Sequence, residues 1–175
     1  MLPDMDGDEL RKLQAPLKER YKTEPSAARI TLHARGEVDA AKLACNVVSR
    51  RTGSMAGLHP ATGGSGAELC SGDILLEALV ACAGVTLAAV STSMGISLSK
   101  AVLSADGVLD FRGTLGVDRA APVGFESIRM TFELASDAPE DKLKKLVELT
   151  ERYCVVFQTL AKPPKLEVHL AGSGH

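Results

Sequence analysis

The sequence has few aromatic residues and almost no net charge. Among 175 residues there is no tryptophan, two tyrosines and four phenylalanines, and 20 basic side chains stand against 22 acidic ones. A nearly neutral chain lacks the basic surface that nucleic acids and anionic membranes attract. We therefore expect no nucleic-acid partner, and a small molecule or another protein instead.

Metal-binding spacings and a secretion signal are missing as well. The cysteines are Cys45, Cys70, Cys82 and Cys154, and the histidines are His33, His59, His169 and His175. Because these positions form neither a CxxC nor an HxxxH motif, we predict no metal and no cofactor. The opening stretch "MLPDMDGDELRKL" is acidic, unlike a secretory signal. With cysteines free of a disulfide framework, this predicts a cytoplasmic protein.

One apolar run invites a membrane assignment. Ile74 to Val90 is 17 residues long, contains Glu77 and has no Trp or Tyr at its ends. A membrane-spanning helix needs about 20 apolar residues and commonly carries aromatic residues at its ends. The run therefore predicts a buried core helix and no membrane partner.

The chain divides into a charged arm and one main domain. Residues 1–26 place Leu10, Leu13 and Leu17 at helical spacing, which predicts a short helical arm. The remaining residues, 27–175, are long enough for one domain with its own core.

Strand patterns occur on both sides of the apolar run. β-Branched residues in "ARITLHARGEV" and "AKLACNVVSRR" surround a turn near Asp39 and predict a hairpin, with Cys45 in its second strand. Residues 52–72 are glycine-rich and predict a long loop, a feature that is often functional. The stretches "SLSKAVLSADGVLDFRGTLG" and "FESIRMTFELA" predict further strands, and "KPPKLEVHL" predicts a final edge strand.

Two helices complete the pattern. Ser71 is a capping residue and Gly95 can end a helix, so that one long helix is predicted over about 73–94.

The second helix starts where Asp137 and Glu140 have capping-box spacing and is predicted to run to about Ala161. Because strands and helices do not alternate strictly along the chain, we predict an α+β fold.

Both helices carry a cysteine on an apolar face. At 100° per residue, Cys82 shares its face with Leu75, Ala78, Leu79, Val85, Thr86 and Ala89. A separate stripe of small residues, Ala81, Gly84, Ala88 and Ser91, would let another backbone approach closely. Cys154 lies on a stripe with Leu143, Leu146, Val147, Thr150 and Phe157. Free cysteine often packs as a small hydrophobic residue, so that each cysteine alone favours a structural role.

The two cysteines and their surroundings resemble a known family. The stretch "CSGDILLEALVACAGVT" is followed about seventy residues later by "LTERYCVVFQTL" and a final strand. This pattern resembles the OsmC/Ohr family of thiol-dependent peroxidases, and the order of elements matches from about Arg29 to Leu170. The resemblance implies an OsmC-like α+β fold in an intertwined homodimer, with two central helices wrapped by sheets from both chains.

The resemblance also implies a reaction. The residue that matches Cys82 attacks an organic or fatty-acyl hydroperoxide and becomes a sulfenic acid. The residue that matches Cys154 resolves it as an intrachain disulfide, which an external dithiol reductant then reduces.

The chain departs from the family around the first cysteine. In peroxidase members an Arg and a Glu bracket the thiolate, and the Glu lies ten residues before the first Cys. Here that position is Gly72, with Asp73 beside it. Asp73 is therefore a candidate catalytic acid, although an acid in the first helical turn is also common.

Two more positions bear on the resemblance, the activating arginine and the residue after the second cysteine. Arg35, Arg50 and Arg51 are the candidates, and Arg35 is the first choice. After the second Cys the family usually has Pro, and this chain has Val155.

Three further residues have competing interpretations. Cys70 precedes the long helix and is a rival reactive thiol, or a small loop residue. About twelve residues of helix separate it from Cys82, roughly 18 Å, so that the two cannot form a disulfide. His59 can line the mouth of a pocket or be solvated, and Glu77 can pair with an arginine of another subunit or lie exposed.

Two functions remain open. The first is a cytoplasmic homodimeric peroxidase that uses Cys82, Cys154, an arginine and Asp73. The alternative is a non-catalytic OsmC-like dimer that binds a hydrophobic ligand or senses redox state. The missing Glu at position 72 favours the alternative, and the two cysteines favour the enzyme.

Overall fold

The structure is a computed structural model that describes residues 6–8, 12, 14, 15, 23, 35–39, 44–48, 54–116 and 118–172. Residues 35–39, 44–48 and 54 are described by their backbone. Most of the predicted arm, and both Arg50 and Arg51, lie outside the described residues.

A small sheet precedes the long helix. Its strands are β1 (Arg35–Asp39), β2 (Ala44–Val48), β3 (Ser54–Gly57) and β4 (Leu69–Cys70), in that order. β1 and β2 pair antiparallel, which confirms the predicted hairpin with Cys45 in its second strand. The prediction of a loop over residues 52–72 was wrong in part, because β3 pairs with β2 and β4 pairs with β3.

The long helix α2 spans Ser71–Met94. Its N-cap is Cys70 and not the predicted Ser71: the Cys70 Sγ accepts the Gly72 N–H at 3.4 Å. Because β4 runs directly into α2, Cys70 is the last extended residue and takes the capping position. Gly95 ends the helix in the left-handed conformation with φ 67°, as predicted.

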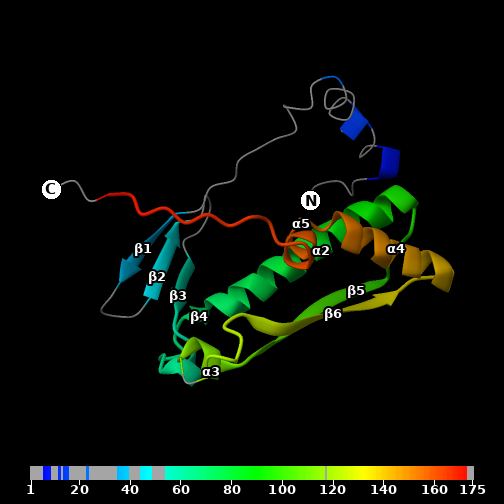
Figure 1. Cartoon of the computed structure of the whole chain (residues 1–175). Helices are drawn as coiled ribbons and strands as arrows, with labels where there is room; N and C mark the ends of the chain where they lie inside the picture. The colour runs from blue at the N-terminus through cyan, green and yellow to red at the C-terminus, as the bar shows by residue number, and fades with distance from the viewer. Residues whose placement is uncertain are drawn as a thin grey trace.

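A two-stranded ladder lies beside α2 (Figure 1). β5 (Lys100–Leu109) and β6 (Phe125–Ala135) pair antiparallel, and the connection between them contains the short helix α3 (Phe111–Thr114). The face of β6 toward the helices carries half-buried side chains at Ile128, Met130, Phe132 and Leu134, the residues predicted to share a face. Helices and small sheets together confirm the predicted α+β class.

The second predicted helix is two helices. α4 (Glu140–Tyr153) and α5 (Val155–Ala161) are separated by Cys154, whose extended backbone has φ −71° and ψ 110°. The predicted capping box is absent, because Pro139 is the N-cap of α4 and no side chain caps it. The continuous helix up to Ala161 was therefore a wrong prediction.

The core lies between one side of α2 and the other elements. One buried cluster joins Leu79 and Ala83 to Cys154, and a second joins Leu87 and Ile96 to Leu146. The opposite side of α2 is open, and Val85 is 74% exposed there. By length and composition α2 is also apolar enough to cross a membrane.

The predicted C-terminal strand does not pair with any described strand. Leu166, Val168 and Leu170 are 84%, 96% and 97% exposed. Lys165 and Glu167 form an ion pair at 2.7 Å. Side chains two residues apart meet in this way along extended backbone, so the segment has an apolar face and a charged face.

Candidate active site

The structure brings Cys82 and Cys154 together. Cys82, half-buried in the middle of α2, packs against Cys154, which is 1% exposed, and the two thiols share a hydrogen bond. The surrounding side chains are apolar and come from the ladder and α5: Leu103, Ala105, Ile128, Met130, Phe132, Val156 and Phe157. The apolar stripes that carry Cys82 and Cys154 are far apart in sequence, and their contact thus brings the two thiols together.

The break at Cys154 supplies hydrogen-bond donors to this pair. The Cys154 N–H still donates to the Thr150 carbonyl of α4 at 2.9 Å, and the Gln158 N–H begins α5 by donating to the Cys154 carbonyl. The three N–H groups between them have no partner within the helix. The Phe157 N–H donates to the Cys154 Sγ at 3.5 Å.

The other two N–H groups, of Val155 and Val156, donate to the Cys82 sulfur. Burial raises the pKa of the Cys82 thiol, but hydrogen bonds from the Val156 N–H, the Cys154 thiol and the Val155 N–H outweigh it. The pKa of Cys82 is therefore lowered. The Thr86 hydroxyl adds the smallest contribution, and it also donates to the Cys82 carbonyl with the two oxygens 2.8 Å apart.

The pKa of Cys154 is shifted in the opposite direction, upward. Burial raises the pKa of the Cys154 thiol, the Phe157 N–H opposes this effect, and donation to Cys82 raises it further. Of the two thiols, Cys82 is therefore the one that loses its proton more readily. This is the difference that a nucleophile and a resolving thiol require.

Asp73 and Arg35 lie away from the thiol pair within one chain. Asp73 precedes Cys82 by nine residues of α2, about 14 Å at 1.5 Å per residue. Arg35 begins β1, and Figure 1 shows the four-stranded sheet beyond the start of α2, whereas α5 lies beside the middle of the helix. Within one chain, the structure does not bring the predicted acid and arginine to the thiol pair.

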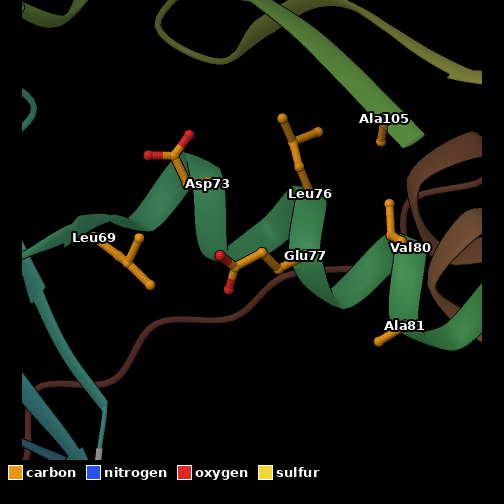
Figure 2. A pocket seen from close by; sticks show the side chains of 7 residues that line it. All are labelled: Leu69, Asp73, Leu76, Glu77, Val80, Ala81 and Ala105. Carbon is orange, nitrogen blue, oxygen red and sulfur yellow. The ribbon is translucent and has the colours of Figure 1, made fainter. Parts of the chain in front are cut away.

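Asp73 lines a cavity of about 500 Å³ along α2. Figure 2 shows Ala105 of β5 across from Leu76 and Val80 of the helix, with the carboxylates of Asp73 and Glu77 one turn apart. Neither carboxylate forms an ion pair with a described residue. The cavity reaches Ala81, the residue before Cys82.

Cys70 and His59 both line a cavity at the start of α2. Among the described residues, no three His, Cys, Asp or Glu side chains are grouped to hold a metal ion.

Sequence reasoning missed the backbone donors of α5. The apolar stripe continues through Cys154, and nothing in it signals a break. The family preference for Pro after this cysteine is the signal that could have shown it, because Pro is favoured at the first position of a helix. Val155 occupies that position here and keeps the N–H that Pro lacks.

Comparisons with known proteins agree with this architecture. Residues 64–169 match the family described as OsmC-like protein. The fold resembles an OsmC-like protein from Mycoplasma pneumoniae (16% identity, 77% of this chain and 89% of the other, TM-score 0.63).

It also resembles an organic hydroperoxide resistance protein OsmC from Legionella pneumophila (14% identity, 77% and 92%, TM-score 0.60). A third likeness is to the organic hydroperoxide resistance protein OhrB of Bacillus subtilis (15% identity, 77% and 93%, TM-score 0.51). No curated protein sequence matches the chain. With more than half of its length matched and the same fold in solved members, the chain belongs to the OsmC-like protein family.

Proposed function

We propose that this protein is a thiol peroxidase that reduces organic hydroperoxides. The Cys82 thiolate attacks the terminal oxygen of ROOH, the O–O bond breaks, and the alkoxide takes a proton and leaves as ROH. Cys82 is then a sulfenic acid. Cys154 attacks its sulfur, which forms the Cys82–Cys154 disulfide and releases water.

The observation that carries the proposal is the contact between the Cys82 and Cys154 thiols, at the point where α5 begins. The lowered pKa of Cys82 supplies the nucleophile, and the raised pKa of Cys154 keeps the second thiol protonated beside it. An external dithiol closes the cycle by reducing the disulfide through thiol–disulfide exchange.

The surroundings of the pair favour an apolar substrate. Leu79 and Ala83 of α2 and the inward residues of the ladder enclose the sulfurs. An alkyl or acyl hydroperoxide buries its chain against such walls, whereas hydrogen peroxide gains nothing from them. Relatives of the same fold from Legionella and Bacillus are named for organic hydroperoxide resistance.

A homodimer is part of the proposal. The open side of α2, with Val85 exposed, and the apolar face of residues 166–170 would be covered by a second copy. Because about 14 Å of helix separates Asp73 from Cys82 in one chain, we assign Asp73 and Arg35 to the thiol pair of the other subunit. We also propose a reducing, cytoplasmic location, where cysteines persist as free thiols.

The test identifies the oxidation product of each cysteine. One equivalent of cumene hydroperoxide should convert the reduced protein to a Cys82–Cys154 disulfide, identified by peptide mass spectrometry. The Cys154→Ser variant should stop at a Cys82 sulfenic acid that dimedone traps. Cys45→Ser and Cys70→Ser are matched controls that keep the disulfide. Oxidation confined to Cys70 in the parent protein would refute the proposal.

The second candidate function is a non-catalytic dimer that binds a hydrophobic ligand or senses redox state. Gly72 favours it, because the acid of peroxidase members is missing at that position. The two functions separate on turnover: a sensor forms the disulfide once, while a peroxidase consumes many equivalents of hydroperoxide when dithiothreitol is present.

A further inference from the structure

The break between α4 and α5 releases backbone carbonyls as well as N–H groups. In a continuous α-helix each N–H donates to the carbonyl four residues earlier. The N–H groups of Cys154 and Gln158 keep this pattern and donate to the carbonyls of Thr150 and Cys154, each at 2.9 Å. Between these two bonds lie the N–H groups of residues 155–157 and the carbonyls of residues 151–153. These groups need partners other than one another.

Glu151 and Val155 are one of the pairs that the break separates. In a continuous helix the Val155 N–H would donate to the Glu151 carbonyl. In the structure the side-chain Nε2 of Gln158 donates to that carbonyl instead, at 3.0 Å. The Val155 N–H donates to the Cys82 sulfur. The Gln158 side chain therefore occupies the position on Glu151 that the Val155 N–H would take.

Val155 does not cause the break by itself. A proline at this position would have no N–H to donate and would disfavour helical backbone at Cys154, so that it would end α4 unaided. Valine keeps its N–H and is tolerated within helices. The helix can therefore close across Cys154 unless another group holds the Glu151 carbonyl.

Gln158 connects the two sides of the break. It lies in α5, is half-buried, and reaches back seven residues to Glu151. Its backbone N–H also donates to the Cys154 carbonyl and so begins the hydrogen bonds of α5. Because a glutamine amide donates without carrying a charge, the bond to Glu151 persists while Cys82 loses its proton.

We propose that Gln158 is a positioning residue for Cys82: its side chain occupies the Glu151 carbonyl, and the Val155 N–H is thereby directed to the Cys82 sulfur. The assignment rests on the proposed function, in which Cys82 is the nucleophile. Because Gln158 acts through Val155, its effect on Cys82 cannot exceed the effect of the Val155 N–H itself.

The main experiment is a double-mutant cycle on the full-length reduced protein, measured as iodoacetamide labelling of Cys82 against pH. Gln158→Met keeps the length and the helix preference of the side chain but removes the donor. Alone, it should slow labelling near pH 7 about two- to fivefold and move the profile to higher pH, as expected for one weakened hydrogen bond. Added to Val155→Pro it should change nothing, because the N–H that Gln158 directs is then absent.

A second measurement observes the Val155 N–H directly by NMR. In the parent protein the amide proton resonance of Val155 should shift as Cys82 ionises, because a thiolate is a stronger acceptor than a thiol. The shift should be smaller in Gln158→Met, since the N–H returns to the Glu151 carbonyl. Cys82→Ser, which lacks the thiol, identifies the part of the shift that Cys82 causes. An equal shift in the parent protein and in Gln158→Met would overturn the proposal.

Lys145→Met is the matched control: it removes an exposed side-chain hydrogen bond to Glu148 on α4 and should label as the parent does. Three labelling results would overturn the proposal. They are an unchanged profile in Gln158→Met, equal slowing by Gln158→Met with and without Val155→Pro, or a loss in Gln158→Met larger than Val155→Pro causes. Neither measurement uses a hydroperoxide, so that the peroxidase function can fail while this proposal stands, and the reverse.

Discussion

Cys70 and Cys82 lie on the same helix and both accept hydrogen bonds from backbone N–H groups, but the donors have different origins. Cys70 takes its donor from Gly72, two residues further on in its own helix. Cys82 takes donors from Val155 and Val156, more than seventy residues away. A helix start is visible in a sequence, whereas the donors at Cys82 exist only after α5 has packed against α2.

The surroundings of the two thiols differ in the same way. Cys82 faces a second thiol that keeps its proton, in an apolar enclosure. Cys70 lines an open cavity beside His59. The local signal that made Cys70 a rival thiol in the sequence therefore identifies a helix cap, and the tertiary contacts favour Cys82 as the proposed nucleophile.

The largest expected effect is on turnover. Cys82→Ser should lower cumene hydroperoxide consumption by at least about a thousandfold, because the nucleophile is lost. Cys70→Ser should stay within about twofold of the parent protein, since its sulfur has no part in the reaction. A coupled assay with dithiothreitol measures both. Comparable losses in the two variants would remove the distinction between the thiols.

A smaller effect, on the reactivity of Cys82, is expected from replacing Cys154. Cys154→Ala removes a donor to Cys82 and should raise the Cys82 pKa, whereas Cys154→Ser retains a hydroxyl donor and should raise it less. Iodoacetamide labelling of Cys82 near pH 7 should be about tenfold slower in the Ala variant. The labelling profile of Cys82 against pH should move to higher pH in the order parent, Ser, Ala. Identical profiles would show that Cys154 does not stabilise the thiolate.

The backbone donor at the start of α5 can be removed alone. Val155→Pro eliminates one N–H at a position where Pro suits the helix, so that the fold should persist. Because this donor contributes less than Cys154 does, Cys82 labelling near pH 7 should slow about three- to fivefold. Cys70 labelling is the internal reference and should not change. Faster labelling of Cys82 would contradict the role assigned to this N–H.

The sequence predicts the α+β class, the first hairpin, the ladder strands and the end of α2 at Gly95. It also places Cys82 and Cys154 on apolar stripes, because periodicity reports which side of a helix is buried. The break at Cys154 escapes this reasoning, since the stripe of Leu146, Thr150 and Phe157 passes through it unchanged.

The remaining differences have one cause, which is contact between distant segments. β3 forms inside a glycine-rich stretch because β2 offers an edge for pairing. Asp73 and Cys82 look close in sequence, yet the rise of the helix separates them by about 14 Å. The alternation of polar and apolar side chains over residues 165–170 is typical of a strand, but no described strand of the same chain pairs with this segment.

The smallest expected effect concerns Thr86, one turn after Cys82. Its hydroxyl contributes least to the lowered pKa of Cys82, and it also donates to the Cys82 carbonyl with the two oxygens 2.8 Å apart. Thr86→Val preserves the shape and removes the hydroxyl, so that Cys82 labelling near pH 7 should slow by about twofold or less. Thr150→Val removes a similar hydroxyl, bonded to the Leu146 carbonyl at 2.8 Å, and is the matched control. A loss above tenfold in Thr86→Val, with Thr150→Val unchanged, would place the main donor to Cys82 on α2 itself.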